Sequence, residues 1–188
     1  MSTDVVQQIV ELFRQRGAEL YGSEAVTQMQ HAIQTAVLAQ QEQAEPALVV
    51  AALLHDVGHI LGHTPLPTDD SQNYDDQHEN RAYAWLHEHF GKQVAEPVQL
   101  HVAAKRYLCS VDPSYCDKLS PTSLKSYFDQ GGPMTTSEQV LFEQHEYYQQ
   151  ALRLRRWDDL AKDPTARMPS IESFMELLQE VRTAQSAI

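Results

Sequence analysis

The sequence is poor in cysteine and in basic residues, and it has no long apolar run. Its two cysteines, Cys109 and Cys116, do not form a CxxC pair, which excludes a structural zinc site built from cysteine and argues against a disulfide framework. No apolar run approaches the roughly 18–20 residues that a bilayer-spanning helix needs. The first residues show no basic start followed by an apolar block, so we expect no secretory signal, no membrane partner and a cytoplasmic protein.

Basic residues are outnumbered, with 14 Lys+Arg against 26 Asp+Glu and a formal net charge of −12 over 188 residues. Such a chain repels the phosphates of nucleic acid, and its basic residues form no dense stripe, so we expect no nucleic-acid partner. An anionic substrate would need a local positive site that opposes this overall field. Histidine, in contrast, is plentiful, with nine residues.

Helical periodicity runs through most of the chain. The stretch ALVVAALLHD, which follows Pro46, is almost wholly apolar and predicts a buried central helix. Other helices are predicted near the N-terminus and over 24–42, 77–90, 93–108, 136–162 and 171–184, with a short one near PTSLKSYF and a loop over 62–76. No strand-like alternation persists and no repeat is visible. The sequence therefore predicts an all-α helical bundle in a single domain, 1–188.

Six side chains that can bind metal fall on inward faces or ends of separate predicted helices. They are four histidines and two aspartates, His31, His55, Asp56, His78, His101 and Asp158. Imidazoles and carboxylates that converge inside a helical bundle are typical of a site for two divalent or trivalent ions. We therefore predict a metal core within about residues 21–160. The histidines that fit no ligand order are interpreted as surface or loop residues, namely His63, His87, His89 and His145.

The order of these ligands resembles the oxygenase branch of the HD-domain superfamily, which is related to myo-inositol oxygenase. More closely, the stretches AALLHDVGH, HVAAKRYL, QGGPM and RRWD resemble the glycine-forming dioxygenases of 2-amino-1-hydroxyethylphosphonate. Together with Tyr21, Glu24 and His31 in YGSEAVTQMQH, the shared stretches span residues 21–158. The resemblance implies an HD-domain fold and a mixed-valent pair of iron ions, Fe(II)/Fe(III).

The resemblance also implies a role for each matching residue. One iron would be bound by His31, His55 and Asp158, and the other by His78 and His101, with Asp56 as the bridge. Tyr21 would occupy an open position on one iron at rest and leave it when substrate arrives. Glu24 would accept the amino group of the substrate, and the phosphonate oxygens would be held by His59, Lys105 and Ser123.

The residue types suit these roles. A phosphonate dianion needs cationic or donor groups, and Lys105 lies four residues after His101 on the same helical face. An ammonium needs a carboxylate, and Glu24 precedes His31 by seven residues, which is two turns of the helix predicted over 24–42. Gly58 is expected to let the backbone turn toward the substrate.

The implied reaction uses O2 to cleave the carbon–phosphorus bond of 2-amino-1-hydroxyethylphosphonate, a small anionic substrate, giving phosphate and glycine. The N-trimethylated substrate, which would give glycine betaine, stays open because a carboxylate with aromatic neighbours also attracts a quaternary cation. A phosphohydrolase that uses the same metals to activate water is a further alternative. A metal- or nucleotide-sensing module is the last one, although such a module needs neither Lys105 nor Glu24.

Overall fold

The computed structural model describes residues 4–61 and 78–185. Within these ranges the chain is helical apart from turns and one isolated bridge between Leu20 and Thr27, so the all-α prediction is confirmed. The elements are α1 (Val5–Arg16), α2 (Gln28–Gln41), α3 (Pro46–Leu54), α4 (Val57–Leu61), α5 (His78–Phe90), α6 (Lys92–Val111), α7 (Pro113–Cys116), α8 (Pro121–Asp129), α9 (Thr136–Glu143), α10 (Tyr148–Leu160), η1 (Ile171–Phe174) and α11 (Met175–Gln185). The predicted loop over 62–76, with His63, lies outside the described residues.

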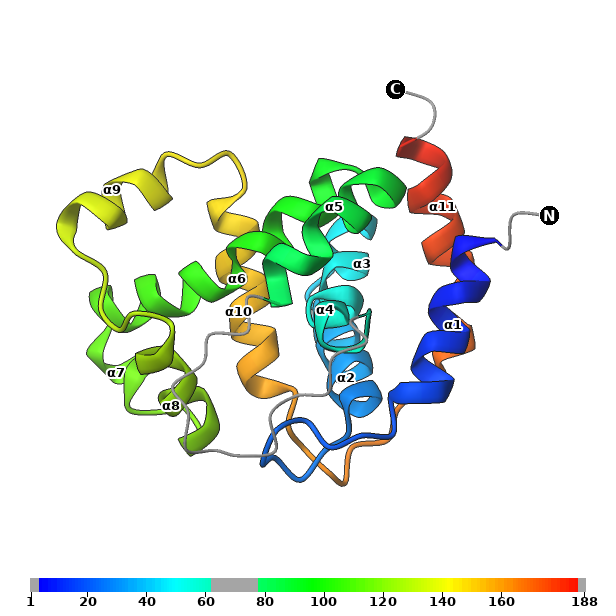
Figure 1. Cartoon of the computed structure of the whole chain (residues 1–188), viewed down its shortest axis with the longest axis horizontal. Helices are drawn as coiled ribbons and strands as arrows, with labels where there is room; N and C mark the ends of the chain where they lie inside the picture. Colours follow the sequence, from blue (N-terminus) through cyan, green and yellow to red (C-terminus); the bar gives the residue numbers. More distant parts are fainter. Residues whose placement is uncertain (1–3, 62–77, 186–188) are drawn as a thin grey trace.

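The centre of the molecule is made by α2, α3, α6 and α10; α3 and α10 contact each other, and both contact α2 and α6 (Figure 1). α1 and α11 come from opposite ends of the chain, yet they lie side by side on one flank, where α11 also contacts α3 and α5. α7, α8 and α9 lie toward the opposite flank (Figure 1). No helix in the described ranges is long and apolar enough to cross a membrane.

α3 is the most deeply buried helix, as its apolar sequence predicts. Pro46 stands in its first turn, where a missing N–H costs nothing, and every residue from Leu48 to Leu54 is buried. The helix ends at Leu54, and the chain then turns through His55 and Asp56 into α4. The polar pair therefore stands at the inner end of an apolar helix, in the middle of the molecule.

α2 begins later than the sequence predicts. Thr27 caps the helix by accepting a hydrogen bond from the backbone N–H of Gln30, whose side chain in turn accepts one from the N–H of Thr27. Glu24 therefore lies in a turn before the helix. The expectation that Glu24 and His31 share a helical face is wrong, because this reciprocal cap makes Gln28 the first residue of the helix.

Two other boundaries differ from prediction. The helix expected over 93–108 is longer, since α6 begins at Lys92 and runs through Pro97 to Val111. The pattern over 136–162 is interrupted after Glu143, so it forms α9 and α10 rather than one helix. The apolar residues of α9 and of α10 each keep helical spacing, so periodicity alone did not predict the break between the two helices.

Gly58 has a different role from the one expected. It lies inside α4 and does not provide a turn. A Cβ at this position would lie 2.0 Å from the backbone oxygen of His78, so only glycine lets the start of α5 approach α4 this closely. Gly58 therefore brings His78 into the centre of the molecule.

Candidate metal centre

All six predicted ligands meet in one buried cluster. His31 comes from α2, His55 and Asp56 from the turn after α3, and the others from the start of α5, the middle of α6 and the end of α10. Each is at most 7% exposed. Four histidines and two aspartates would not be stable together in a protein interior without compensation for their polar atoms.

The first group of ligand atoms gathers around His31 and His55. Their Nε2 atoms are 3.1 Å apart. Oδ1 of Asp158 lies 3.3 Å from Nε2 of His31 and 3.9 Å from Nε2 of His55. Oδ2 of Asp56 lies 3.3 Å from Nε2 of His55 and 3.7 Å from Nε2 of His31.

The second group gathers around His78 and His101, whose Nε2 atoms are 3.2 Å apart. Here it is Oδ1 of Asp56 that approaches, at 3.1 Å from Nε2 of His78 and 3.7 Å from Nε2 of His101. The two oxygens of Asp56 therefore face two different histidine pairs. A carboxylate placed in this way is suited to being shared by two ions.

Hydrogen bonds to the backbone fix how three of these imidazoles are protonated. The Nδ1 atoms of His31, His55 and His101 lie 2.9, 2.8 and 2.6 Å from the carbonyl oxygens of Ala161, Ala52 and Val98. A carbonyl only accepts, so each Nδ1 carries a hydrogen, and each Nε2, once deprotonated, presents a lone pair to an ion in the cluster. Lone pairs that face each other across about 3 Å fit two ligands of one ion, each about 2.1 Å from it.

The charges in the cluster also favour a bound cation. Burial would raise the pKa of Asp56, but His55 and His78 hold it well below its usual range, so the carboxylate is ionised. Burial, reinforced by His78, lowers the pKa of His101 to about 3, which keeps this imidazole neutral. Within the described part of the chain, Oδ2 of Asp56 and Oδ1 of Asp158 are buried and accept no hydrogen bond. The residues present thus fit a pair of metal ions.

Arg155, which the sequence interpretation missed, orients Asp158. Its Nη1 lies 2.7 Å from Oδ2 of Asp158, so the other carboxylate oxygen is left to face the histidines. Arg155 is itself buried, and it also pairs with Asp159 and donates to the hydroxyl of Tyr115. Its place three residues before a predicted ligand, on the same helical face, was the available signal.

A pocket of about 180 Å³ opens beside the cluster. Four of the five predicted substrate residues line it, namely Tyr21, His59, Lys105 and Ser123. The ring of His59 stacks on that of His78 with 4.0 Å between centroids, and its Nε2 lies 3.9 Å from Oδ1 of Asp56. The wall of the pocket is therefore continuous with the second group of ligand atoms.

Lys105 is a buried cation at the pocket wall. It is 2% exposed, and its Nζ donates to the hydroxyl of Ser126 at 2.6 Å. Burial, together with the nearby charge of Arg155, lowers the pKa of Lys105 to about 7. Because an anion in the pocket would favour the protonated form, Lys105 is suited to bind one.

Tyr21 covers the first group of ligand atoms. Its ring stacks on that of His31, with 3.8 Å between centroids and 16° between planes. Burial, with the carboxylates of Asp158 and Asp56 acting in the same direction, raises the pKa of Tyr21 well above its usual value. Its phenol is therefore neutral near pH 7.

Glu24, the fifth predicted substrate residue, is not among the described residues that line the pocket. Its Oε1 accepts a hydrogen bond from Ser120 at 2.6 Å and lies 3.5 Å from Nζ of Lys162. Lys162 was also missed from the sequence. It follows the end of α10 and reaches Glu24 only through the fold.

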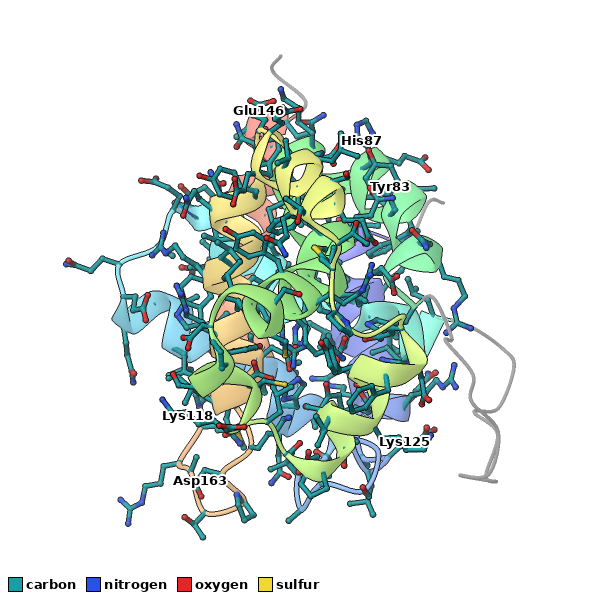
Figure 2. The ribbon with its side chains drawn as sticks, turned by 90° about the vertical axis from the view of Figure 1, so that its left-hand side faces the viewer. Tyr83, His87, Lys118, Lys125, Glu146 and Asp163 are labelled. Carbon is teal, nitrogen blue, oxygen red and sulfur yellow. The ribbon has the colours of Figure 1, made fainter. Side chains whose placement is uncertain are left out.

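The remaining described histidines lie away from the cluster, as expected. His87 is exposed on α5, with Tyr83 one turn before it, and Figure 2 shows both at the periphery of the molecule. His89 is partly exposed, and His145 lies 3.5 Å from Glu96.

Comparison with known proteins identifies the family. A model of the HD domain matches residues 29–122, a range that includes His31 to His101. The chain belongs to the HD-domain family. This HD-domain chain is 43% identical over 173 residues to the hydroxymethylphosphonate dioxygenase of Gimesia maris, covering 90% of this chain and 84% of that one.

A second relative is the [1-hydroxy-2-(trimethylamino)ethyl]phosphonate dioxygenase (glycine-betaine-forming) of Leisingera caerulea. It is 34% identical over 179 residues, which cover 95% of this chain and 90% of the relative. The predicted resemblance to HD-domain phosphonate oxygenases is thereby confirmed. The two dioxygenase relatives make this HD-domain chain an oxygenase, and its His/Asp groups are those of a metal-binding protein.

Proposed function

We propose that this HD-domain chain is a di-iron dioxygenase that cleaves the carbon–phosphorus bond of a 1-hydroxyphosphonate and releases phosphate. The observation that carries the proposal is the position of Asp56, whose two oxygens face two histidine pairs at the edge of a pocket that contains Lys105. The names of the two relatives, both dioxygenases of hydroxylated phosphonates, support it.

In this proposal each histidine pair holds one ion. His31, His55 and Asp158 would hold the first and His78 and His101 the second, with one carboxylate oxygen of Asp56 toward each group. The nitrogen and oxygen donors would also suit zinc or manganese, so the dioxygenase relatives are the reason for iron. Bound iron, as Fe(II)/Fe(III), supplies the chemistry by which O2 oxidises the carbon that carries the hydroxyl.

The chain itself binds and orients the substrate. Lys105, Ser123 and His59 place one cation and two further hydrogen-bonding side chains around the pocket, and these would hold the phosphonate oxygens. Such a local positive site is what the net charge of −12 requires for an anionic substrate. Tyr21 stacks on His31, beside the residues that would hold the first ion, and in this proposal its side chain moves aside when substrate binds.

The substrate predicted from the sequence is 2-amino-1-hydroxyethylphosphonate, with Glu24 as the partner of its ammonium; oxidation by one O2 gives glycine and phosphate. Its N-trimethylated form would give glycine betaine. Hydroxymethylphosphonate, which would give formate and phosphate, is a second candidate. The relative of Gimesia maris and the contact between Glu24 and Lys162 favour this smaller substrate.

The test is oxygen uptake and phosphate release by the iron-loaded protein with ascorbate. We expect one phosphate for each O2 consumed with at least one of the three hydroxyphosphonates. The phosphohydrolase alternative predicts metal-dependent release of p-nitrophenol from p-nitrophenyl phosphate without O2. That activity, with no oxygen uptake on any of the three substrates, would refute the dioxygenase proposal.

A further inference from the structure

A pair of opposite charges, Lys162 and Glu24, lies directly behind the pocket wall. Nζ of Lys162 is 2.8 Å from Oγ of Ser123, 3.3 Å from Oγ of Ser120 and 3.5 Å from Oε1 of Glu24. It also lies 6.0 Å from the ring centroid of Tyr21. Ser123 and Tyr21 both line the pocket, so the ammonium of Lys162 is one side chain away from a bound substrate.

The pair is sheltered enough for its charges to matter. The side chain of Lys162 is 12% exposed and that of Glu24 is 16% exposed, so salt and water screen this pair less than a pair at the surface. Ser120 also donates to the same oxygen of Glu24 that faces Lys162. The carboxylate of Glu24 is thus already neutralised by a residue of the chain.

We propose that Lys162 determines substrate choice by holding Glu24, so that the pocket selects a 1-hydroxyphosphonate with no cationic group. This inference rests on the proposed function and narrows its substrate class. A substrate ammonium placed beside Glu24 would also lie close to the ammonium of Lys162, which is 3.5 Å from the same carboxylate. Two like charges at such short distances repel each other. A substrate such as hydroxymethylphosphonate has no such group and meets no penalty.

Lys162 also prepares Ser123 for an anion. A lysine ammonium only donates, so Oγ of Ser123 is the acceptor of their 2.8 Å hydrogen bond. The hydrogen of the Ser123 hydroxyl is then left to donate toward the pocket. The same lysine therefore disfavours a cationic group on the substrate and favours its phosphonate.

The test is to remove the charge and measure the preference between two substrates. We expect the iron-loaded wild type to turn over hydroxymethylphosphonate with a higher kcat/KM than 2-amino-1-hydroxyethylphosphonate. Lys162→Met should reduce this preference by about tenfold or more, which corresponds to the loss of one close charge interaction. Lys162→Arg should keep it. Lys118→Met is the matched control, because Lys118 is exposed at the surface (Figure 2).

A second arm does not depend on turnover. Without O2, calorimetry measures the binding of methylphosphonate and 2-aminoethylphosphonate to the iron-loaded proteins. We expect the wild type to bind methylphosphonate more tightly than 2-aminoethylphosphonate. Lys162→Met should shift this binding preference toward 2-aminoethylphosphonate. The double variant Lys162→Met with Glu24→Gln should not show that shift. Equal preferences in wild type and Lys162→Met, or a wild type that prefers the amine, would overturn the inference. Failure of every turnover assay would refute the proposed function alone, since binding still decides the role of Lys162.

Discussion

At the scale of single residues, the centre depends on imidazoles that are already oriented. His101 donates through Nδ1 to the carbonyl of Val98, so its Nε2 is aimed at the cluster before any ion binds. Replacing His101 by alanine leaves the second ion with His78 and the bridging Asp56 alone. We expect the iron content to be about one ion per chain in His101→Ala, against about two in the wild type, because two protein ligands hold a divalent ion poorly.

Iron content of the purified proteins, measured by plasma emission spectroscopy, checks this prediction. His87→Ala is the control, since His87 is exposed on α5 and belongs to neither histidine pair. Unchanged iron in His101→Ala would contradict the ligand role of His101.

Lys105 gives the reaction a pH dependence of defined sign. Its pKa is lowered to about 7, chiefly by burial, so the ammonium is present below that pH and is lost as the pH rises through it. Only the ammonium attracts a phosphonate. We therefore expect kcat/KM for the hydroxyphosphonate to fall above about pH 7, and this fall to be absent from the residual activity of Lys105→Met.

Steady-state kinetics from pH 6.5 to about 9 make the measurement, with Lys118→Met as the exposed control. The kcat/KM of the wild type and of the control should decrease in parallel as the pH rises. The kcat/KM of Lys105→Met should be low and independent of pH. A wild-type kcat/KM that stays constant over this range would show that Lys105 is not the phosphonate cation.

At the scale of helices, the contact between α4 and α5 positions the second histidine pair. Gly58 allows it, because a Cβ there would lie 2.0 Å from the backbone oxygen of His78, which cannot rotate away. Gly58→Ala should therefore push His78 from Asp56, lower the iron content, and reduce the free energy of unfolding by about 1–3 kcal/mol. Chemical denaturation and iron analysis measure both effects, and a variant equal to wild type in both would contradict this role.

The sequence was sufficient for most helices but not for their ends. α3 follows from its unbroken apolar stretch, and α5 from a 3.6-residue pattern that ends at Gly91. The start of α2 was predicted four residues too early. The helical pattern continues before Thr27, but the capping hydrogen bonds at Thr27 make Gln28 the first helical residue. Apolar spacing carries no information about such a local competition.

The buried cluster of histidines and aspartates could be predicted from the sequence, whereas the wall behind the pocket could not. His55 and Asp56 are conspicuous because polar residues interrupt an apolar helix, and the order of the other four ligands narrows the interpretation. Lys162 stands after the end of α10, and its link to Glu24 joins residues far apart in the chain. No periodicity or motif marks such a contact, which only the fold creates.

At the scale of the whole molecule, an acidic protein gathers several of its few basic side chains at the proposed substrate pocket. The net charge is −12, yet Lys105, Arg155 and Lys162 all lie at or directly behind the pocket. The two buried carboxylates are balanced by Arg155 and, in the proposed function, by iron. In this proposal the phosphonate is held by cations at the pocket, although the net charge of the whole protein would repel it.

The origin of the oxygen in the product tests the central claim most directly. The iron-loaded protein is given the hydroxyphosphonate that supports the fastest oxygen uptake, under ¹⁸O₂ in ordinary water, and the carboxylate product is analysed by mass spectrometry. Oxidation of the hydroxyl-bearing carbon by O2 predicts one ¹⁸O atom in the formate or glycine. A carboxylate without ¹⁸O, labelled only when the water carries the isotope, would contradict the dioxygenase account.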